Sequence, residues 1–225
     1  MVVMKTILLS VVGSRLHGTA TPNSDTDLRG VFLAPIEEIL SPFATIKETN
    51  WIENDVDNVS YELRHFCRLA STGNPSALEV LVGTPHEETP EGTALKVLLP
   101  KFLSERCYDA FMGYSNNQEK KFRQDKDKRK HKYAMAHTRT LYQLLHLLKT
   151  GELIGSYSGG VVAELNAIRE NMRSDTEIMS RIFQLEGECK TARELKMLPS
   201  EPDHKAIEAF VLSCYGYGTT TPRIE

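Results

Sequence analysis

The sequence predicts an α+β fold in which a small mixed β-sheet with flanking helices is followed by a mainly α-helical lobe. Segments typical of strands, rich in β-branched residues or alternating with period two, gather before about residue 65. From about residue 94 onward the apolar residues instead recur at helical spacing, as at Leu141, Leu145 and Leu148. We therefore predict a catalytic core over residues 1–95 and a helical, substrate-closing lobe over residues 96–225.

Three segments of the core are strand candidates. Residues 6–12 are aliphatic and stop at Gly13-Ser14, which indicates a buried strand that turns into a helix with Ser14 as its N-cap. Residues 28–33 follow a connector rich in Gly, Pro and Asp, and Pro35 ends them. Residues 56–63 alternate with period two and run into a helical pattern.

Further along, residues 76–82 place apolar side chains at helical spacing after Gly73-Asn74-Pro75. Residues 83–93 are rich in Pro, Glu and Thr, which predicts a loop between the two lobes. The remainder of the chain then reads as mostly helical, and it contains no internal repeat.

Composition excludes several classes of protein. The formal net charge of -3 gives no overall field that attracts nucleic acid, so a polyanion site must be local. Four cysteines without a CxxC pair fit neither a disulfide framework nor a zinc site, and we expect reduced structural thiols. No apolar run reaches the length of a membrane span, so we expect no membrane partner and a cytoplasmic location.

The residues that predict chemistry are Gly13 and Ser14, followed after a short spacer by Asp25 and Asp27. If both aspartates lie on one strand, their carboxylates share a face, because side chains alternate along a strand. Magnesium prefers such hard oxygen ligands and shares them with substrate phosphates. Gly13 lets the backbone approach a phosphate, and Ser14 adds a hydroxyl donor.

The run from Gly13 to Phe32 resembles the signature of the DNA polymerase beta-like nucleotidyltransferase superfamily. More narrowly, it is similar to the predicted nucleotidyltransferases of the RNA-repair-pathway DNA polymerase beta family. The segments 57–66 and 74–79 fit the same family, as does a later helix with Lys132 and Arg139 ahead of Thr150-Gly151-Glu152. The resemblance covers roughly residues 5–155 and implies a nucleotidyltransferase-type sheet.

The resemblance implies an enzyme that moves a nucleoside monophosphate from a nucleoside triphosphate (NTP) to an acceptor hydroxyl and releases pyrophosphate. Its cofactors would be two Mg2+ ions, which Mn2+ can replace. Asp25 and Asp27 would hold the metals together with a third acid from a neighbouring strand. Asp57 matches that third acid best, and Glu62 is the reserve choice.

The resemblance also assigns the nucleotide to Gly13 and Ser14, with Lys132 and Arg139 two helical turns apart on one helix face. Arg15, next to Ser14, is a further phosphate-binding candidate because arginine suits phosphate recognition. One position departs from the family: a histidine is expected three residues before Arg139, where this chain has Ala136, with His137 displaced by one.

Several alternatives stay open. Asp25 to Gly30 resembles the start of an EF-hand loop, but Arg29 replaces an oxygen ligand there. Arg29 is also a candidate ion-pair partner for Asp25 or Asp27. The basic run from Lys120 to Lys132 fits either a nucleic-acid backbone or a solvated helix face.

The acceptor is not fixed by the sequence. An RNA or DNA end is favoured over a protein hydroxyl or a small molecule because of the basic run from Lys120 to Lys132. The alternative function is a catalytically inactive nucleotide sensor or protein-pairing module on the same fold. Magnesium-dependent release of pyrophosphate would discriminate between the two.

Overall fold

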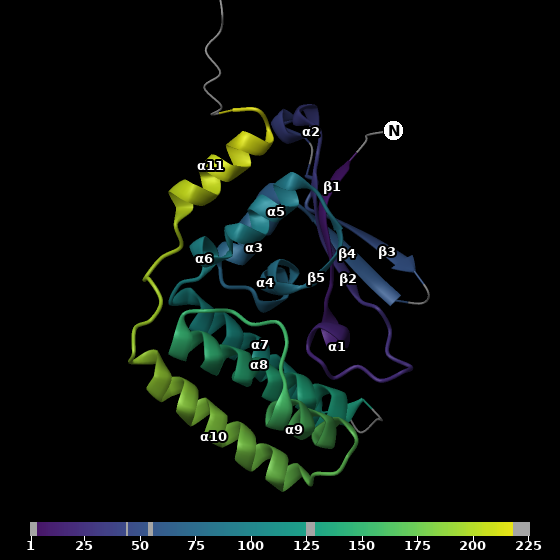
Figure 1. Ribbon diagram of the computed structural model, residues 1–225, viewed down its shortest axis with the longest axis vertical. Helices are drawn as coiled ribbons and strands as arrows, with labels where there is room; N and C mark the ends of the chain where they lie inside the picture. Colours follow the sequence, from purple (N-terminus) through teal and green to yellow (C-terminus); the bar gives the residue numbers. More distant parts are fainter. Residues whose placement is uncertain (1–3, 44, 54–55, 125–128, 218–225) are drawn as a thin grey trace, which may run out of the picture.

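The computed structural model describes residues 4–43, 45–53, 56–124 and 129–217. These residues form an α+β fold around a five-stranded mixed sheet with the strand order β3-β4-β2-β1-β5 (Figure 1). The predicted fold class is confirmed. The sheet consists of β1 (Lys5–Val11), β2 (Leu28–Leu33), β3 (Glu48–Glu53), β4 (Val56–Glu62) and β5 (Thr84–Glu88).

Most neighbouring strands are antiparallel, but the central pair β2 and β4 is parallel. In that pair Arg29 lies opposite Val59 and Phe32 lies opposite Glu62. β1 pairs antiparallel with β2 on one side and with β5 on the other. The parallel pair matters for the site, because the segments that precede β2 and begin β4 meet at the same edge of the sheet.

The predicted strands over residues 6–12, 28–33 and 56–63 correspond to β1, β2 and β4. The prediction of a loop over residues 83–93 is wrong, because β5 and the start of α5 (Pro90–Val97) lie there. β5 is a fully exposed edge strand, so it needs no apolar alternation, and its Pro85 and glutamates imitate a loop. β3, also an edge strand, was not predicted either.

Three helices cover one face of the sheet, namely α3 (Leu63–Ser71), α4 (Pro75–Val82) and α5 (Figure 1). Side chains of β1 and β2 on this face, such as Ile7 and Val31, join the core together with Leu63, Phe66 and Leu78. Three short helices complete this part of the chain: α1 (Gly13–Leu16), α2 (Ile36–Leu40) and α6 (Leu99–Phe102).

The helical part packs around α8 (Lys130–Thr150), which contacts α7 (Arg106–Gln124), α9 (Gly159–Arg169) and α10 (Asp175–Arg193). The periodic leucines Leu141, Leu145 and Leu148 are buried in it. The last helix, α11 (His204–Cys214), returns to α3 and α6 beside the sheet (Figure 1). The division of the chain into two lobes at residue 95 stays a prediction. The helix α11 belongs to the predicted second lobe but packs against α3 of the predicted catalytic core.

The cysteines agree with the expectation of reduced structural thiols. Cys67, Cys107 and Cys189 are buried, Cys214 is half-buried, and all are free. Burial raises the pKa of Cys67 to about 12, which keeps this thiol protonated and unreactive. In the part of the chain that the structure describes, no helix has both the length and the apolar character to cross a membrane.

Candidate active site

A cavity of about 290 Å³ lies where α1 and the start of β2 face the helices α8 and α9. Acidic side chains that precede β2 or lie on α4 line it, together with cations from β2, α8 and α9. Six residues that the sequence singled out line this one cavity: Gly13, Ser14, Asp25, Asp27, Lys132 and Arg139. The structure therefore brings most of the predicted site together, while its chemical role stays a prediction.

Gly13 lies directly against one of the candidate metal ligands. The backbone N–H of Val12 donates to the carbonyl of Asp27 at 2.9 Å, which extends the pairing of β1 and β2. Gly13 has φ +66, and a Cβ atom built on it would lie 2.1 Å from Oδ2 of Asp27. Only glycine fits at this position, since any side chain would collide with the carboxylate.

Ser14 does not cap the helix, contrary to the prediction. The helix α1 begins at Gly13, and the N-cap position is Val12, which makes no side-chain capping bond. The positive φ of Gly13 lets the chain enter the helix two residues earlier than a cap at Ser14 would. Ser14 therefore lies inside α1 and lines the cavity.

Asp25 and Asp27 precede β2, which begins at Leu28, so they do not share a strand as predicted. Both nevertheless line the cavity, with Asp25 exposed and Asp27 half-buried. Burial raises the pKa of Asp27, and the Asp25 carboxylate adds to this, whereas Lys132 and Arg29 act in the opposite direction. A cation near Asp27 would relieve the cost of its burial.

Two arginines hold the loop that precedes these aspartates. Arg15 donates through Nε to the carbonyl of Asp25 at 3.2 Å and through Nη2 to the carbonyl of Ser24 at 2.8 Å. Arg169 donates to the carbonyl of Thr19 and lines the cavity. Arg15 does not line the cavity, so its contacts favour a role in holding the loop over the predicted role in binding nucleotide.

Glu79 on α4 is the buried acid of the cavity, and sequence reasoning missed it. Its Oε1 accepts from Nη1 of Arg139 at 2.7 Å and lies 3.3 Å from Nε2 of His17, and its Oε2 lies 3.7 Å from Nη1 of Arg29. Although burial acts to raise the pKa of Glu79, Arg139, His17 and Arg29 lower it well below its usual range.

This cluster corrects the expected partner of Arg29. The expectation was an ion pair with Asp25 or Asp27, but the Arg29 guanidinium approaches Glu79 and donates to the carbonyl of Ser76 at 3.3 Å. Glu79 was missed because its partners come from α1, β2 and α8. Local spacing in a sequence carries no signal for such a long-range convergence.

His17 and Thr19 are buried polar residues of the cavity, and the Thr19 hydroxyl keeps hydrogen-bonding capacity. Nδ1 of His17 lies 2.7 Å from the carbonyl of Gly155, which fixes the orientation of the ring. Thr19 is only 1% exposed, and its hydroxyl has no hydrogen-bond partner among the described residues. Because buried hydroxyls are costly when unpaired, a polar ligand in this cavity would satisfy Thr19.

The two candidates for the third acid occupy different places. Asp57 on β4 is exposed. In the parallel pair of β2 and β4, Arg29 lies opposite Val59, so the same register two residues earlier sets Asp27 opposite Asp57. Asp57 does not line the cavity. Among the described residues, no group of three acidic, histidine or cysteine side chains is close enough to hold a metal ion.

Glu62 lies at the other end of β4, opposite Phe32. Five residues of strand separate Phe32 from Asp27, roughly 16 Å. The Glu62 carboxylate is fully buried and caps α3 by accepting from the backbone N–H groups of Arg64 and His65, each at 3.1 Å. Its position and its capping bonds argue against the reserve assignment.

The departure at position 136 has a structural counterpart. Ala136 lines the cavity, where the family resemblance leads one to expect a histidine. His137 is fully buried instead, with no hydrogen-bond partner among the described residues. Burial lowers the pKa of His137 to about 4, so this ring is neutral at neutral pH, and it does not line the cavity.

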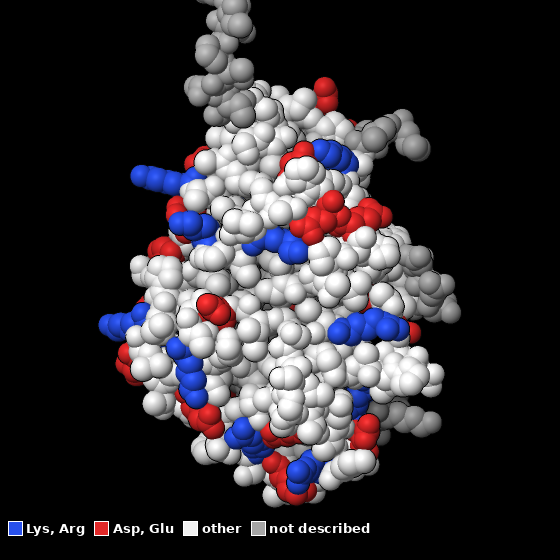
Figure 2. All heavy atoms as spheres, in the orientation of Figure 1, with Lys and Arg blue, Asp and Glu red and all other residues white. Residues whose placement is uncertain are grey.

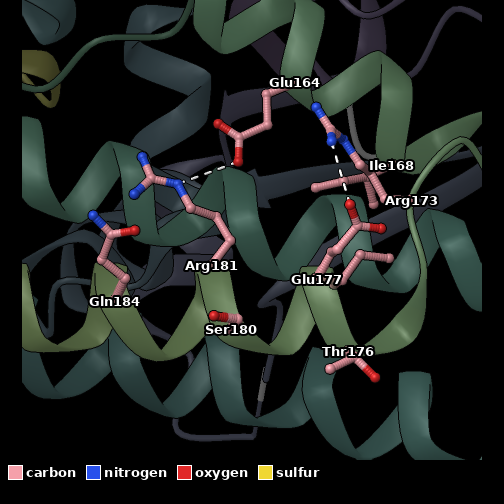
Figure 3. Close-up of a pocket in the computed structure, with 9 residues that line it drawn as sticks. Glu164, Ile168, Arg173, Thr176, Glu177, Ser180, Arg181 and Gln184 are labelled. Atoms are coloured by element: carbon pink, nitrogen blue, oxygen red, sulfur yellow. Dashed lines mark hydrogen bonds and ion pairs between the residues drawn. The ribbon is translucent and has the colours of Figure 1, made fainter.

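A larger cavity of about 500 Å³ lies elsewhere, between α9 and α10 (Figure 3). There Nε of Arg181 donates to Glu164 at 3.2 Å, and Arg173 donates to Glu177 at 3.5 Å. Each of these guanidinium groups has a carboxylate of its own. This second cavity, which we call the α9–α10 cavity, therefore offers little uncompensated charge to a ligand.

The basic run from Lys120 to Lys132 is only partly described, since residues 125–128 lie outside the described residues. In its described part Arg123 pairs with Glu119 at 2.7 Å, and Lys130 pairs with Asp175. On the face shown in Figure 2, basic and acidic side chains are interspersed, and the described residues form no continuous basic surface. These contacts favour the interpretation as a solvated helix face.

The chain is similar in sequence to a phage protein and distantly similar to a solved structure. An uncharacterized 38.9 kDa protein of phage T4, from the nrdC-mobD intergenic region, is 32% identical over 139 residues. That match covers 53% of this chain and 39% of the phage protein, so the chain spans well under half of its relative. A nucleotidyltransferase-like protein from Exiguobacterium sibiricum shares 14% identity over 86% of this chain and 72% of its own, with a TM-score of 0.32. This last likeness is too distant to bear on the fold or the function.

A family model matches far more of the chain than the phage protein does. It describes the RNA repair pathway DNA polymerase beta family and matches residues 2–183. This range contains the whole sheet and the cavity with Gly13, Asp25, Asp27, Lys132 and Arg139. The sequence resemblance to this family is therefore confirmed, and the chain belongs to the RNA repair pathway DNA polymerase beta family.

Proposed function

We propose that this protein transfers a nucleoside monophosphate from an NTP to an acceptor hydroxyl and releases pyrophosphate. The observation that carries the proposal is one cavity in which Asp25 and Asp27 lie beside Gly13 and face cations from α8 and α9. Acids for metal ions and cations for phosphates are the two requirements of phosphoryl transfer. Membership of the family supports the same reaction.

The residues present fit a Mg2+ site that is completed by the substrate. Asp25 and Asp27 offer hard oxygen ligands in one cavity, and magnesium takes its remaining ligands from phosphates and water. When bound, Mg2+ or Mn2+ would lower the pKa of the acceptor hydroxyl and neutralise charge on the triphosphate. Asp57 would become a third metal ligand only when its exposed side chain turns toward Asp27.

The other residues bind and orient the triphosphate. Gly13 leaves room for the Asp27 carboxylate beside the phosphates, and Ser14 contributes a hydroxyl from the same turn. Lys132 and Arg139 face the cavity from α8 and stabilise the charge of the leaving pyrophosphate. Asp57 accepts the proton of the acceptor hydroxyl.

We take the end of an RNA strand as the acceptor. The support is the description of the family, which names an RNA repair pathway. The basic run from Lys120 to Lys132 adds little, since Arg123 and Lys130 in its described part are already paired with acids. A DNA end, a protein hydroxyl and a small molecule are therefore controls in the test.

The test measures pyrophosphate release from each of the four NTPs with Mg2+ and a short single-stranded RNA that has a free 3′-hydroxyl. The expected result is release that depends on both the metal and the RNA, with an RNA product one nucleotide longer. Tight NTP binding without release, across RNA, DNA, protein and small-molecule acceptors, would instead favour a nucleotide sensor on the same fold.

A further inference from the structure

The candidate active site continues onto the open face of the sheet. Ser24 and Asp25 border the cavity of about 290 Å³, which we call the catalytic cavity after its proposed role, and also a second cavity of about 310 Å³. Leu28 and His86 border that second cavity and also a third, of about 420 Å³. The three cavities therefore form one path, whose second and third members we call the sheet-face groove.

The groove lies on the face of the sheet opposite to α3, α4 and α5. Arg29 and Val31 of β2 point toward those helices, as the contact of Arg29 with α4 and the place of Val31 in the core show. Leu28 and Phe32 alternate with them and line the groove instead. Leu28 and Phe32 are 7% and 2% exposed, so the floor of the groove is apolar.

The lining of the groove suits an aromatic, uncharged ligand group. Trp51 on β3 is half-buried in its wall, and Thr6, Thr49 and Ser60 add hydroxyls. Among the described residues no lysine or arginine lines the groove, in contrast to the catalytic cavity. A groove with aromatic and hydroxyl groups but no cation fits a nucleobase better than a phosphate.

Ser60 provides an independent indication of a ligand. It is 6% exposed, it lines the groove, and its hydroxyl has no hydrogen-bond partner among the described residues. A Cβ atom on Gly30 would lie 2.9 Å from this Oγ, so glycine leaves the hydroxyl its space. Buried hydroxyls are rarely left unpaired, and a base edge in the groove would pair with this one.

The chemistry of the reaction indicates whether the nucleobase in the groove belongs to the incoming NTP or to the acceptor. In phosphoryl transfer the attacking oxygen and the leaving oxygen lie roughly in line across the phosphorus. The leaving pyrophosphate belongs with Lys132, Arg139 and Arg169 in the catalytic cavity. The acceptor hydroxyl must then approach past Asp25 from the opposite side, which is where the sheet-face groove begins.

The distance along this route is short. The backbone N–H of Leu28, next to Asp27, donates to Oδ1 of Asn58 at 2.8 Å. Asn58 in turn lies opposite Trp51 in the antiparallel pair of β3 and β4. One hydrogen bond and one cross-strand pair therefore connect the aspartate with the tryptophan.

The geometry points to the sheet-face groove as the acceptor site, in which the terminal base of a single-stranded RNA stacks on Trp51 and pairs with Ser60. This inference rests on the proposed transferase activity for the direction of attack. Trp51 is the one tryptophan of the chain, so its fluorescence reports occupancy of the groove without any turnover.

The first experiment titrates the full chain with oligoadenylate that has a free 3′-hydroxyl, without NTP, and follows tryptophan fluorescence. Saturable quenching is expected, whereas ATP with Mg2+ alone should leave the fluorescence nearly unchanged. Equal quenching by ATP would assign the groove to the incoming nucleotide and overturn the inference. Quenching by an unstructured peptide but not by RNA would overturn it as well.

The second experiment measures RNA affinity by anisotropy of a labelled oligoadenylate. Trp51→Ala should weaken binding by about 5- to 150-fold, the range for one stacked base, and by a similar factor at low and high salt. Trp51→Phe should retain most of the affinity because the aromatic ring remains. Ser60→Ala, which removes no bond within the described part of the protein, should weaken binding by about 2- to 12-fold.

The matched control is Ile52→Ala, because Ile52 is the next residue on β3 and is 72% exposed. It points away from the groove, so RNA affinity should not change. Pyrophosphate release separates this inference from the proposed function. If Trp51→Ala releases pyrophosphate with an unchanged KM for RNA, the groove is not the acceptor site, but the transferase activity is supported. If RNA quenches the fluorescence but no pyrophosphate is released, the groove binds RNA and the proposed transferase activity is wrong.

Discussion

The catalytic cavity and the α9–α10 cavity both hold arginines beside glutamates, but their charges are arranged differently. In the α9–α10 cavity the pairs are local and partly exposed: Arg173 and Glu177 are four residues apart on the chain, and Arg181 contacts Glu164 of the adjacent helix (Figure 3). Each positive group there is neutralised by an acid beside it.

In the catalytic cavity the charges converge from distant parts of the chain. Glu79 is buried among Arg139, His17 and Arg29, which belong to three other elements. Lys132 also faces this cavity, and the described residues contain no ion-pair partner for it. The smaller cavity thus has charge to offer a ligand, whereas the larger one does not, so charge compensation rather than volume supports the proposed site.

The largest expected effect is that of Asp27→Asn on catalysis. Loss of one carboxylate leaves the metal and phosphate charges uncompensated, so kcat/KM for NTP should fall at least about 1,000-fold. Because burial raises the pKa of Asp27, the neutral side chain should not lower the unfolding temperature. The matched control is Glu177→Gln in the α9–α10 cavity, for which pyrophosphate release should stay within about twofold.

Glu79→Gln should have the largest effect on stability. It leaves Arg139 buried without its acid, and breaking a buried pair in this way costs about 3–5 kcal/mol. Glu164→Gln, whose side chain is 26% exposed, should cost at most about 1 kcal/mol. Urea denaturation at neutral pH measures both free energies of unfolding, and equal losses would contradict the contrast between the cavities.

The Glu79 effect should also depend on pH. The pKa of Glu79 is lowered in the folded protein from an ordinary value of 4.5, so its ionised form stabilises the fold at pH values above 4.5. This contribution is lost as the pH falls below about 4.5, where the unfolded chain takes up the proton first. The stability difference between wild type and Glu79→Gln should therefore be constant from pH 7 to 5 and shrink at lower pH.

Gly13→Ala should have an intermediate effect, and Gly159→Ala is its matched control. Both glycines begin a helix with a positive φ, of +66 and +59, so both substitutions carry the same backbone strain. Only at Gly13 does the new Cβ meet the Asp27 carboxylate, while nothing lies within 4 Å at Gly159. Gly13→Ala should cost about 1–3 kcal/mol more than Gly159→Ala and should also reduce pyrophosphate release.

These contrasts also explain what the sequence was able to predict. Gly13, Asp25 and Asp27 lie close together in the chain, so local spacing was enough to single them out, whereas Lys132 and Arg139 on α8 were found through the resemblance to the family. The central strands were predictable for the same reason, because their buried side chains leave a periodic pattern.

The residues and strands that were missed depend on contacts between distant segments. Glu79 and Arg169 join the cavity only because α4 and α9 pack near α1, and no local pattern records that packing. The edge strand β5 is exposed along its whole length, so no apolar alternation marks it. Arg15 was assigned to phosphate by its neighbours in sequence, whereas its contacts with Ser24 and Asp25 are visible only in three dimensions.

The smallest effect is expected for Arg181→Met in the α9–α10 cavity. Arg181 is 28% exposed and contacts Glu164 and the hydroxyl of Tyr142, so its loss should cost no more than about 1 kcal/mol of unfolding free energy. The KM for NTP should stay within about twofold of wild type, since no charge in the catalytic cavity changes. The comparison variant is Lys132→Met, which removes a cation from the catalytic cavity and should raise the KM for NTP. An equal rise for Arg181→Met would show that the larger cavity takes part in binding nucleotide, and the distinction between the two cavities by charge compensation would then fail.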